Sequence, residues 1–178
     1  MGETTTYRSA FARVLAVVTI ALCGVVLVSL ALTADLETTS RYAAPVILLA
    51  LLAWVAYWRP RVEISDGGIE IRNVWRTVEV PWPALQEVDS RLGLRLVTAY
   101  GTYQAWAVPG PRRTRGTREV QTPEAAALVV ARWEALREAG YLDEPRLERP
   151  RARTRLHVVE LTAAALLLAL SVVALAVG

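Results

Sequence analysis

The sequence has no lysine, one cysteine, one histidine, one methionine and one phenylalanine in 178 residues. The single cysteine, Cys23, excludes a disulfide framework and a cysteine-based metal site within one chain. Because His157 is the only histidine, most histidine-dependent catalysis and metal binding are excluded as well. All 20 basic residues are arginine, but a net charge of +3 is too modest for a dedicated nucleic-acid binder. No phosphate loop, paired carboxylates or nucleophile motif is present, so we expect no enzyme, no catalytic residue, no cofactor, no metal and no nucleic-acid partner.

Charge is also missing from three long stretches. The runs Val14–Ala34 and Tyr42–Trp58 contain no charged residue, and the run Val158–Val177 contains only Glu160. A helix over the first run is about 31 Å long, which matches a hydrocarbon core of about 30 Å. The second run is shorter, but Pro45 lies in its first turn, where a helix tolerates proline. We therefore predict three transmembrane helices, at about 14–34, 42–58 and 157–178.

Arginine placement predicts the orientation of these helices. The N-terminal tail, the start of the segment after the second run and the approach to the third run are all rich in arginine. The segment Asp35–Arg41 between the first two runs has one arginine against two acidic residues. The positive-inside rule therefore predicts a multi-pass protein of the cell inner (plasma) membrane. Its N-terminus and middle segment are cytoplasmic, and its C-terminus is external. Small residues at Ser29–Ala31 would suit signal cleavage, but the apolar run continues past them, which favours a retained helix.

The middle segment has the alternation of short strands. Val62 and Ile64 alternate with polar residues, Asp66-Gly67-Gly68 supplies a tight turn, and Ile69 and Ile71 resume the alternation. Similar short runs continue to residue 108, which gives about six strands in fifty residues, and a brief seventh strand is expected at 117–120. The segment is therefore β-rich.

One helix is expected after these strands, at about 123–139. Thr122 can cap its N-terminus, and Pro123 suits its first position. The negative charge of Glu124 interacts favourably with the positive end of the helix dipole, and Gly140 can end the helix. A single amphipathic helix after a run of strands covers an open edge of a strongly bent sheet. Four tryptophans are expected in the core of this module: Trp75, Trp82, Trp106 and Trp133.

Six or seven short strands closed by one C-terminal helix resemble a pleckstrin-homology (PH) fold. The series Val62-x-Ile64-x-x-Gly67, then Val80-Pro81-Trp82, then Leu94-x-Leu96 is similar to the bacterial PH-domain families. It is closest to actinobacterial membrane proteins with two N-terminal spans, the low-molecular-weight protein antigen 6-like group. The resemblance covers about residues 42–141 and implies a membrane-attached, non-catalytic domain without catalytic residues.

The expected fold class is α+β: three transmembrane helices plus a PH-like module of about seven antiparallel strands, bent into a partly open barrel and capped by one C-terminal helix. Residues 1–58 form the tail and two transmembrane helices, and 59–142 form the cytoplasmic PH-like domain. Residues 143–156 form an arginine-rich juxtamembrane linker before the third helix at 157–178.

Two arginine clusters are candidates for contact with anionic lipid headgroups or a partner, at about 1 kcal/mol per arginine near the surface. They are Arg112, Arg113, Arg115 and Arg118 before the predicted helix, and Arg149, Arg151, Arg153 and Arg155 before the third span. The simpler reading, which we favour, is a solvated loop for the first cluster and a determinant of topology for the second. The turn Asp66-Gly67-Gly68 is short and acidic, so phosphoinositide binding around it is not expected. Glu160 is expected at the interface, without an intramembrane cationic partner.

The predicted function is that of a non-catalytic integral membrane protein that presents a PH-like domain at the cytoplasmic face for protein or anionic-lipid interaction. The alternative is an accessory subunit of a larger transporter or membrane enzyme complex that assembles through its helices. Small residues at Gly24, 163–165 and Ala169 would favour helix contacts. The sequence specifies neither the partner nor the oligomeric state.

Overall fold

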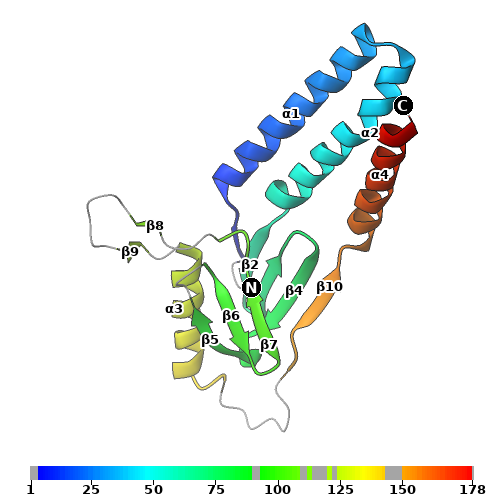
Figure 1. Cartoon of the computed structure of the whole chain (residues 1–178). Coiled ribbons are helices and arrows are strands. Elements are labelled where there is room, and N and C mark those ends of the chain that lie inside the picture. The colour runs from blue at the N-terminus through cyan, green and yellow to red at the C-terminus, as the bar shows by residue number, and fades with distance from the viewer. Residues whose placement is uncertain are drawn as a thin grey trace. The chain divides into compact units, whose positions relative to one another are not determined.

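The computed structural model describes residues 4–89, 93–108, 112–113, 120–121, 124–142 and 150–177. The chain divides into two compact units, and Figure 1 colours it by residue number. We call the first, Met1–Ser9 with Pro60–Leu156, the module, and the second, Ala10–Arg59 with His157–Gly178, the helical unit. The mixed α+β architecture predicted from the sequence is confirmed.

The helical unit consists of α1 (Ala10–Thr33), α2 (Leu36–Ala53) and α4 (Val158–Val177), and α2 continues as a π-helical turn at Trp54–Trp58. Within the described residues these three helices are long and apolar enough to cross a membrane. Many of their large apolar side chains are exposed, such as Leu32 and Leu166. Because exposed apolar surface is costly in water, this exposure suits a lipid environment.

The second span begins earlier than the sequence predicted, at Leu36. Asp35 is its N-cap, and the carboxylate of Asp35 accepts a hydrogen bond of 3.2 Å from the backbone N–H of Thr38. Hydrogen bonding by the Thr38 side chain, and secondarily this backbone bond, favours the charged form and lowers the pKa of Asp35. A capped first turn therefore makes residues 36–41 helical, although they were expected in a loop.

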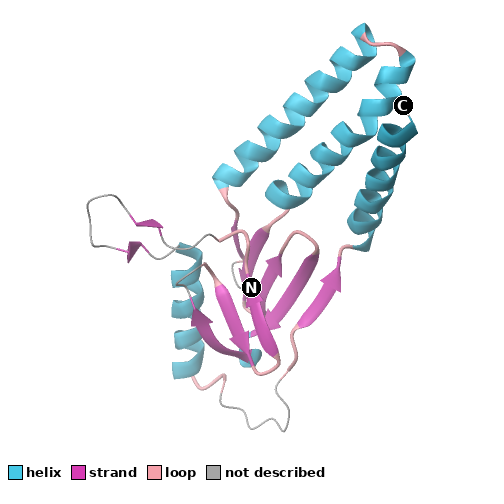
Figure 2. Ribbon diagram, in the orientation of Figure 1, coloured by secondary structure: helices cyan, strands magenta, loops and turns pink. Residues whose placement is uncertain are grey.

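The module contains a five-stranded antiparallel sheet in the order β1-β2-β3-β4-β10 (Figure 2). Its strands are β1 (Thr5–Tyr7), β2 (Arg61–Ser65), β3 (Gly68–Arg72), β4 (Arg76–Pro81) and β10 (Arg153–Leu156). A three-stranded sheet contains β5 (Leu85–Asp89), β6 (Arg95–Thr98) and β7 (Gly101–Gln104). The short pair β8 (Arg112–Arg113) and β9 (Val120–Gln121) precedes α3 (Glu124–Glu138). The PH-like combination of open antiparallel sheets and a C-terminal helix is therefore present.

Two strands of the large sheet come from segments that were not expected to form strands. β1 lies in the predicted N-terminal tail, and β10 lies in the predicted linker 143–156. Neither has an alternating apolar pattern: β1 has the sequence Thr-Thr-Tyr, and all four residues of β10 are exposed. They are strands because the edges of β2 and β4 supply backbone partners. The brief strand expected at 117–120 is described only at Val120, which lies in β9.

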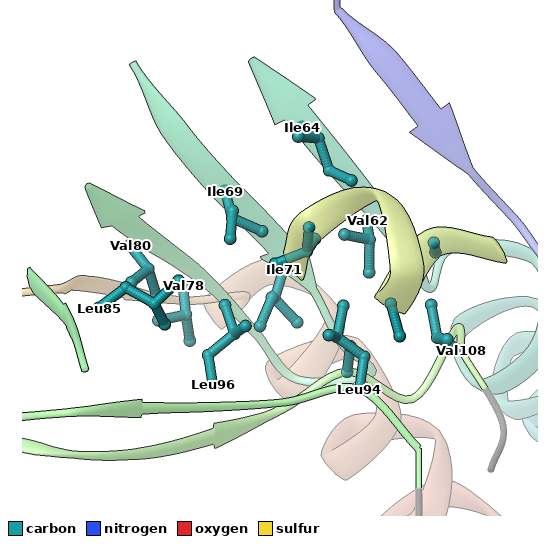
Figure 3. Close-up of a cluster of buried hydrophobic side chains, with 14 of the residues drawn as sticks. Val62, Ile64, Ile69, Ile71, Val78, Val80, Leu85, Leu94, Leu96 and Val108 are labelled. Atoms are coloured by element: carbon teal, nitrogen blue, oxygen red, sulfur yellow. The ribbon is translucent and has the colours of Figure 1, made fainter. Parts of the chain in front are cut away.

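The core of the module lies between the two larger sheets and α3. Alternate residues of the strands point into it, as Figure 3 shows for Val62, Ile64, Ile69 and Ile71. α3 adds three small or branched residues: Ala125, Ala126 and Val129. Burial of each valine, leucine or isoleucine contributes about 1.5–3 kcal/mol, so this core is the main source of stability.

The tryptophans divide between core and surface. Trp82 is buried, and its indole Nε1–H donates a 2.9 Å hydrogen bond to the Ser65 carbonyl. Trp133 packs against the core from α3. The prediction was wrong for Trp106, whose side chain is 68% exposed. Trp106 follows β7 in a turn in which its neighbours Ala105 and Ala107 are the buried residues.

Gly68 is required at the start of β3 because two strands approach closely there. A Cβ atom at this position would lie 2.5 Å from the carbonyl oxygen of Val80 on β4, which is closer than real contacts allow. Its neighbour Gly67 has open space, with the nearest atom, Ser65 Oγ, 4.0 Å away. The two glycines of the predicted turn therefore have different roles.

Candidate functional site

The arginines predicted from the sequence are only partly brought together. Arg112 and Arg113 lie in β8, and Arg115, Arg118 and Arg149 lie outside the described residues. The Arg151 guanidinium lies 4.9 Å from the centre of the Tyr100 ring. Arg151 and Arg153 line one depression together with Glu70 and Glu79. The lining therefore contains both signs of charge, with two carboxylates beside the two arginines.

The solvent-facing side of the five-stranded sheet contains three arginine–glutamate ion pairs. The closest N–O distances are 2.6 Å for Arg61–Glu63, 2.9 Å for Arg72–Glu70 and 3.3 Å for Arg155–Glu79. Glu63, Glu70 and Glu79 lie directly opposite one another on β2, β3 and β4, an unfavourable arrangement for like charges. The arginines relieve this repulsion, and partly exposed pairs of this kind contribute about 0–1 kcal/mol each. Arg61, Arg72 and Arg155 are therefore already paired with glutamates of the sheet.

One end of the five-stranded sheet makes all the connections to the apolar helices. Arg8–Ser9 connects β1 to α1. Arg59–Pro60 connects the π-helical turn at the end of α2 to β2, and His157 connects β10 to α4. The strand register joins these points, because Tyr7 lies opposite Val62, Arg61 opposite Arg72 and Leu156 opposite Arg76. We call this end, defined by Tyr7, Arg61, Arg72, Arg76 and Leu156, the tether end. The turn Asp66–Gly67 closes the other end, which we call the far end.

Asn73 holds the turn between β3 and β4 against the segment that follows β7. Its side-chain Nδ2 donates a 2.7 Å hydrogen bond to the Gln104 carbonyl, and its Oδ1 accepts one of 3.0 Å from the Trp106 N–H. Its own backbone N–H donates to the Arg76 carbonyl at 2.9 Å. The Asn73 side chain is 7% exposed, so these bonds are largely shielded from water. They fix the backbone beneath the exposed Trp106.

A depression of about 560 Å³ lies beside this clamp. Its lining residues come from the β3–β4 turn, β4, β6, β7 and the segment after β7: Asn73, Val74, Trp75, Arg76, Arg95, Thr102, Gln104 and Trp106. Two are arginines, two are tryptophans and none is acidic. Among the residues that the structure describes, neither Arg76 nor Arg95 forms an ion pair, although Asp89 lies opposite Arg95 in the register. The depression is therefore suited to an anion, and we call it the tether-end depression.

Sequence reasoning missed this depression because its residues lie in three separate stretches, at 73–76, 95 and 102–106. None of the stretches is an arginine cluster, which was the pattern sought. Trp106 offered one signal, since it stands between two alanines within the last predicted strand, which ends at residue 108. The register that brings Arg76 and Arg95 to one depression is not readable from the sequence.

The far end has a different electrostatic character. The carboxylate of Asp66 in the turn forms an ion pair with Arg132 of α3. At the tether end, by contrast, burial raises the pKa of Tyr7, and Glu124 at the start of the same helix adds a smaller contribution. The acidic turn predicted at 66–68 is therefore already paired with a cation.

Glu160 has a cationic partner that the sequence did not predict. Its Oε1 lies 2.7 Å from Arg59 Nη1, and the Arg59 guanidinium also lies 5.3 Å from the centre of the Trp54 ring. The two side chains are 16% and 19% exposed, for Arg59 and Glu160 respectively. The expectation failed because the two residues lie a hundred positions apart. The pair links the end of α2 to the start of α4 within the helical unit.

Comparison with known families supports the fold described above. Residues 59–139 match the family model described as Bacterial PH domain. That segment contains β2 to β9 and α3, including most of the core. No curated protein and no solved structure matches the chain. The chain is therefore a membrane protein that contains a bacterial PH domain.

Proposed function

We propose that this chain is a non-catalytic integral protein of the plasma membrane that presents its PH domain at the cytoplasmic face as an interaction module. The main support comes from the tether end, where three strands of one sheet are joined to three apolar helices by connections of one or two residues. Such short connections keep the domain beside the bilayer. A PH domain without a free linker is placed to act at the membrane surface.

The cytoplasmic orientation is supported by the distribution of arginine. Arg8, Arg59 and Arg61 lie within two residues of the connections, and Arg155 lies two residues before His157. The connection between α1 and α2, Ala34–Asp35, contains no arginine. Cytoplasmic flanks of membrane spans have an excess of arginine and lysine, which favours the module on the inside.

A non-catalytic role is supported by the family, since PH domains are generally interaction modules. The charges favour an anionic ligand at the tether-end depression, where two arginines lack carboxylate partners among the described residues. Anionic lipid is therefore the ligand class that we favour over a protein partner. The closer resemblance to the actinobacterial antigen 6-like group stays a prediction.

Single-cysteine labelling of intact cells tests the orientation. In a Cys23→Ala background, one reporter is Leu36→Cys, at an 85% exposed position after the α1–α2 connection, and the other is Gln86→Cys on an exposed position of β5. A membrane-impermeant maleimide is expected to label the first in intact cells and the second only after permeabilisation. Labelling of Gln86→Cys in intact cells would refute the cytoplasmic orientation.

The alternative function, an accessory subunit assembled through the helices, has weaker support. Ala163 and Ala164 are half-buried within the helical unit, so part of the small-residue set already packs inside the chain. A Cβ atom added at Gly24 would meet no atom within 4 Å apart from its own stretch of helix, so Gly24 stays available for a partner helix. This alternative predicts that a larger membrane protein co-purifies in mild detergent, and that Gly24→Leu abolishes the co-purification.

A further inference from the structure

The charge of the tether-end depression is not balanced by its own lining. Arg76 is exposed and Arg95 is half-buried, and they share the depression with three neutral polar residues, Asn73, Thr102 and Gln104. In contrast, the depression at the far end combines Arg151 and Arg153 with Glu70 and Glu79. Arg61, Arg72 and Arg155 are occupied by glutamates of the sheet. Arg76 and Arg95 are therefore the arginines best placed to receive an external anion.

Covalent geometry limits how far this depression lies from a membrane span. Arg76 lies opposite Leu156 in the register, with about 5 Å between Cα atoms in such a pair. α4 begins at Val158, two residues after Leu156, which is a reach of at most about 7 Å. The strand that pairs with Arg76 is therefore joined to the third span by a single residue, His157.

Two tryptophans give the same depression an interfacial composition. Trp75 is half-buried, and Trp106 is 68% exposed although it is large and apolar. Exposure of the apolar tryptophan ring to water is unfavourable, whereas the headgroup layer of a membrane accommodates both the ring and the indole N–H. The hydrogen bonds from Asn73 hold this segment in place, so the exposure of Trp106 is built into the fold.

We infer that the tether-end depression binds the phosphate group of an anionic phospholipid, through Arg76 and Arg95, with Trp75 and Trp106 in the headgroup layer. This inference rests on the proposed function, because it needs the module beside the bilayer. It assigns the lipid contact to the end of the sheet opposite the turn Asp66–Gly67. The ligand is a lipid of the same membrane that the helices cross.

Lipid retention by the full-length chain tests this inference. The purified chain in neutral detergent is given equal amounts of phosphatidylglycerol and phosphatidylcholine, and native mass spectrometry counts the bound lipids. The wild-type chain is expected to prefer phosphatidylglycerol. The double variant Arg76→Gln, Arg95→Gln is expected to lose about thirtyfold of this preference, from two lost arginine–headgroup contacts.

Two controls separate a site from general charge. The double variant Arg151→Gln, Arg153→Gln removes the same charge from the far-end depression and is expected to keep the wild-type preference. Arg76→Lys, Arg95→Lys keeps the charge and is expected to keep most of the preference. Equal losses in the two glutamine variants, or no loss in either, would overturn the inference, as would loss only in the far-end variant.

A soluble competitor separates the lipid from free phosphate. Glycerol 3-phosphate has the phosphate but not the acyl chains, and is expected not to displace phosphatidylglycerol at equal concentration. Displacement would overturn the lipid assignment. The labelling experiment above is independent of this one, so unchanged lipid retention together with a cytoplasmic Gln86→Cys would reject only the site and leave the proposed function standing.

Discussion

At the tether end of the five-stranded sheet the chain leaves for three apolar helices, whereas at the far end β2 and β3 are joined by the two-residue turn Asp66–Gly67. The far end contains both signs of charge: Asp66 pairs with Arg132, and Arg151 and Arg153 line a depression together with two glutamates. The tether end has Arg76 and Arg95 without such partners among the described residues, beside two tryptophans. The two ends thus differ in the sign of the charges that line their depressions, and not in the number of arginines, which is two in each.

The largest effect is expected when the edges of the sheet are removed. A segment of residues 59–142 lacks β1 and β10, so β2 and β4 each lose a neighbouring strand. We expect this segment to self-associate, because bare edges accept strands from other molecules. A segment of residues 59–156 restores β10 and is expected to self-associate less. Light scattering of the two segments checks this, and a monodisperse 59–142 segment would show that the edge strands are dispensable.

At the far end, Gly68→Ala is expected to lower the free energy of unfolding by about 3 kcal/mol, because the new Cβ would collide with the Val80 carbonyl. Its control is Gly67→Ala, one residue away in open space, with an expected change within about 0.5 kcal/mol. Thermal unfolding of the full chain in detergent measures both. Equal effects of the two substitutions would mean that the close approach of β3 and β4 is not the constraint.

At the tether end, Asn73→Asp is expected to cost about 2 kcal/mol, because a carboxylate cannot donate to the Gln104 carbonyl. The new carboxylate can still accept from the Trp106 N–H, so hydrogen exchange at the Trp106 amide is expected to change little in Asn73→Asp. Asn73→Ala removes both side-chain bonds and is expected to accelerate exchange at this amide more than exchange in β2 or β3. An unchanged exchange rate of the Trp106 amide in Asn73→Ala would contradict the proposed clamp.

The smallest effect concerns Tyr7 in β1. Burial, with a smaller contribution from Glu124, raises the pKa of Tyr7 above its ordinary value of 10.0. The folded state therefore retains the phenol proton more strongly, and its contribution to stability is complete below pH 10.0 and is lost as the pH rises through the folded-state pKa. Tyr7→Phe is expected to flatten this alkaline decline in an unfolding series. An unchanged decline in Tyr7→Phe would assign it to other groups.

The sequence predicts those parts of the fold in which the pattern is local. Long uncharged runs identify the spans, and alternation around Asp66-Gly67-Gly68 identifies the β2–β3 hairpin and the core face of each strand. β1 and β10 escape prediction because an edge strand is defined by its neighbour and needs no apolar face of its own. The Arg59–Glu160 pair and the tether-end depression escape prediction because tertiary packing brings distant residues together.

The pairing of β10 with β4 has a consequence for the time course of synthesis. More than seventy residues separate the two strands, so β4 is translated long before its partner exists. Contacts of such sequence separation form late in folding. The five-stranded sheet therefore cannot be completed until the segment just before the third span has been synthesised. Completion of the domain is thus coupled to insertion of that last helix into the membrane.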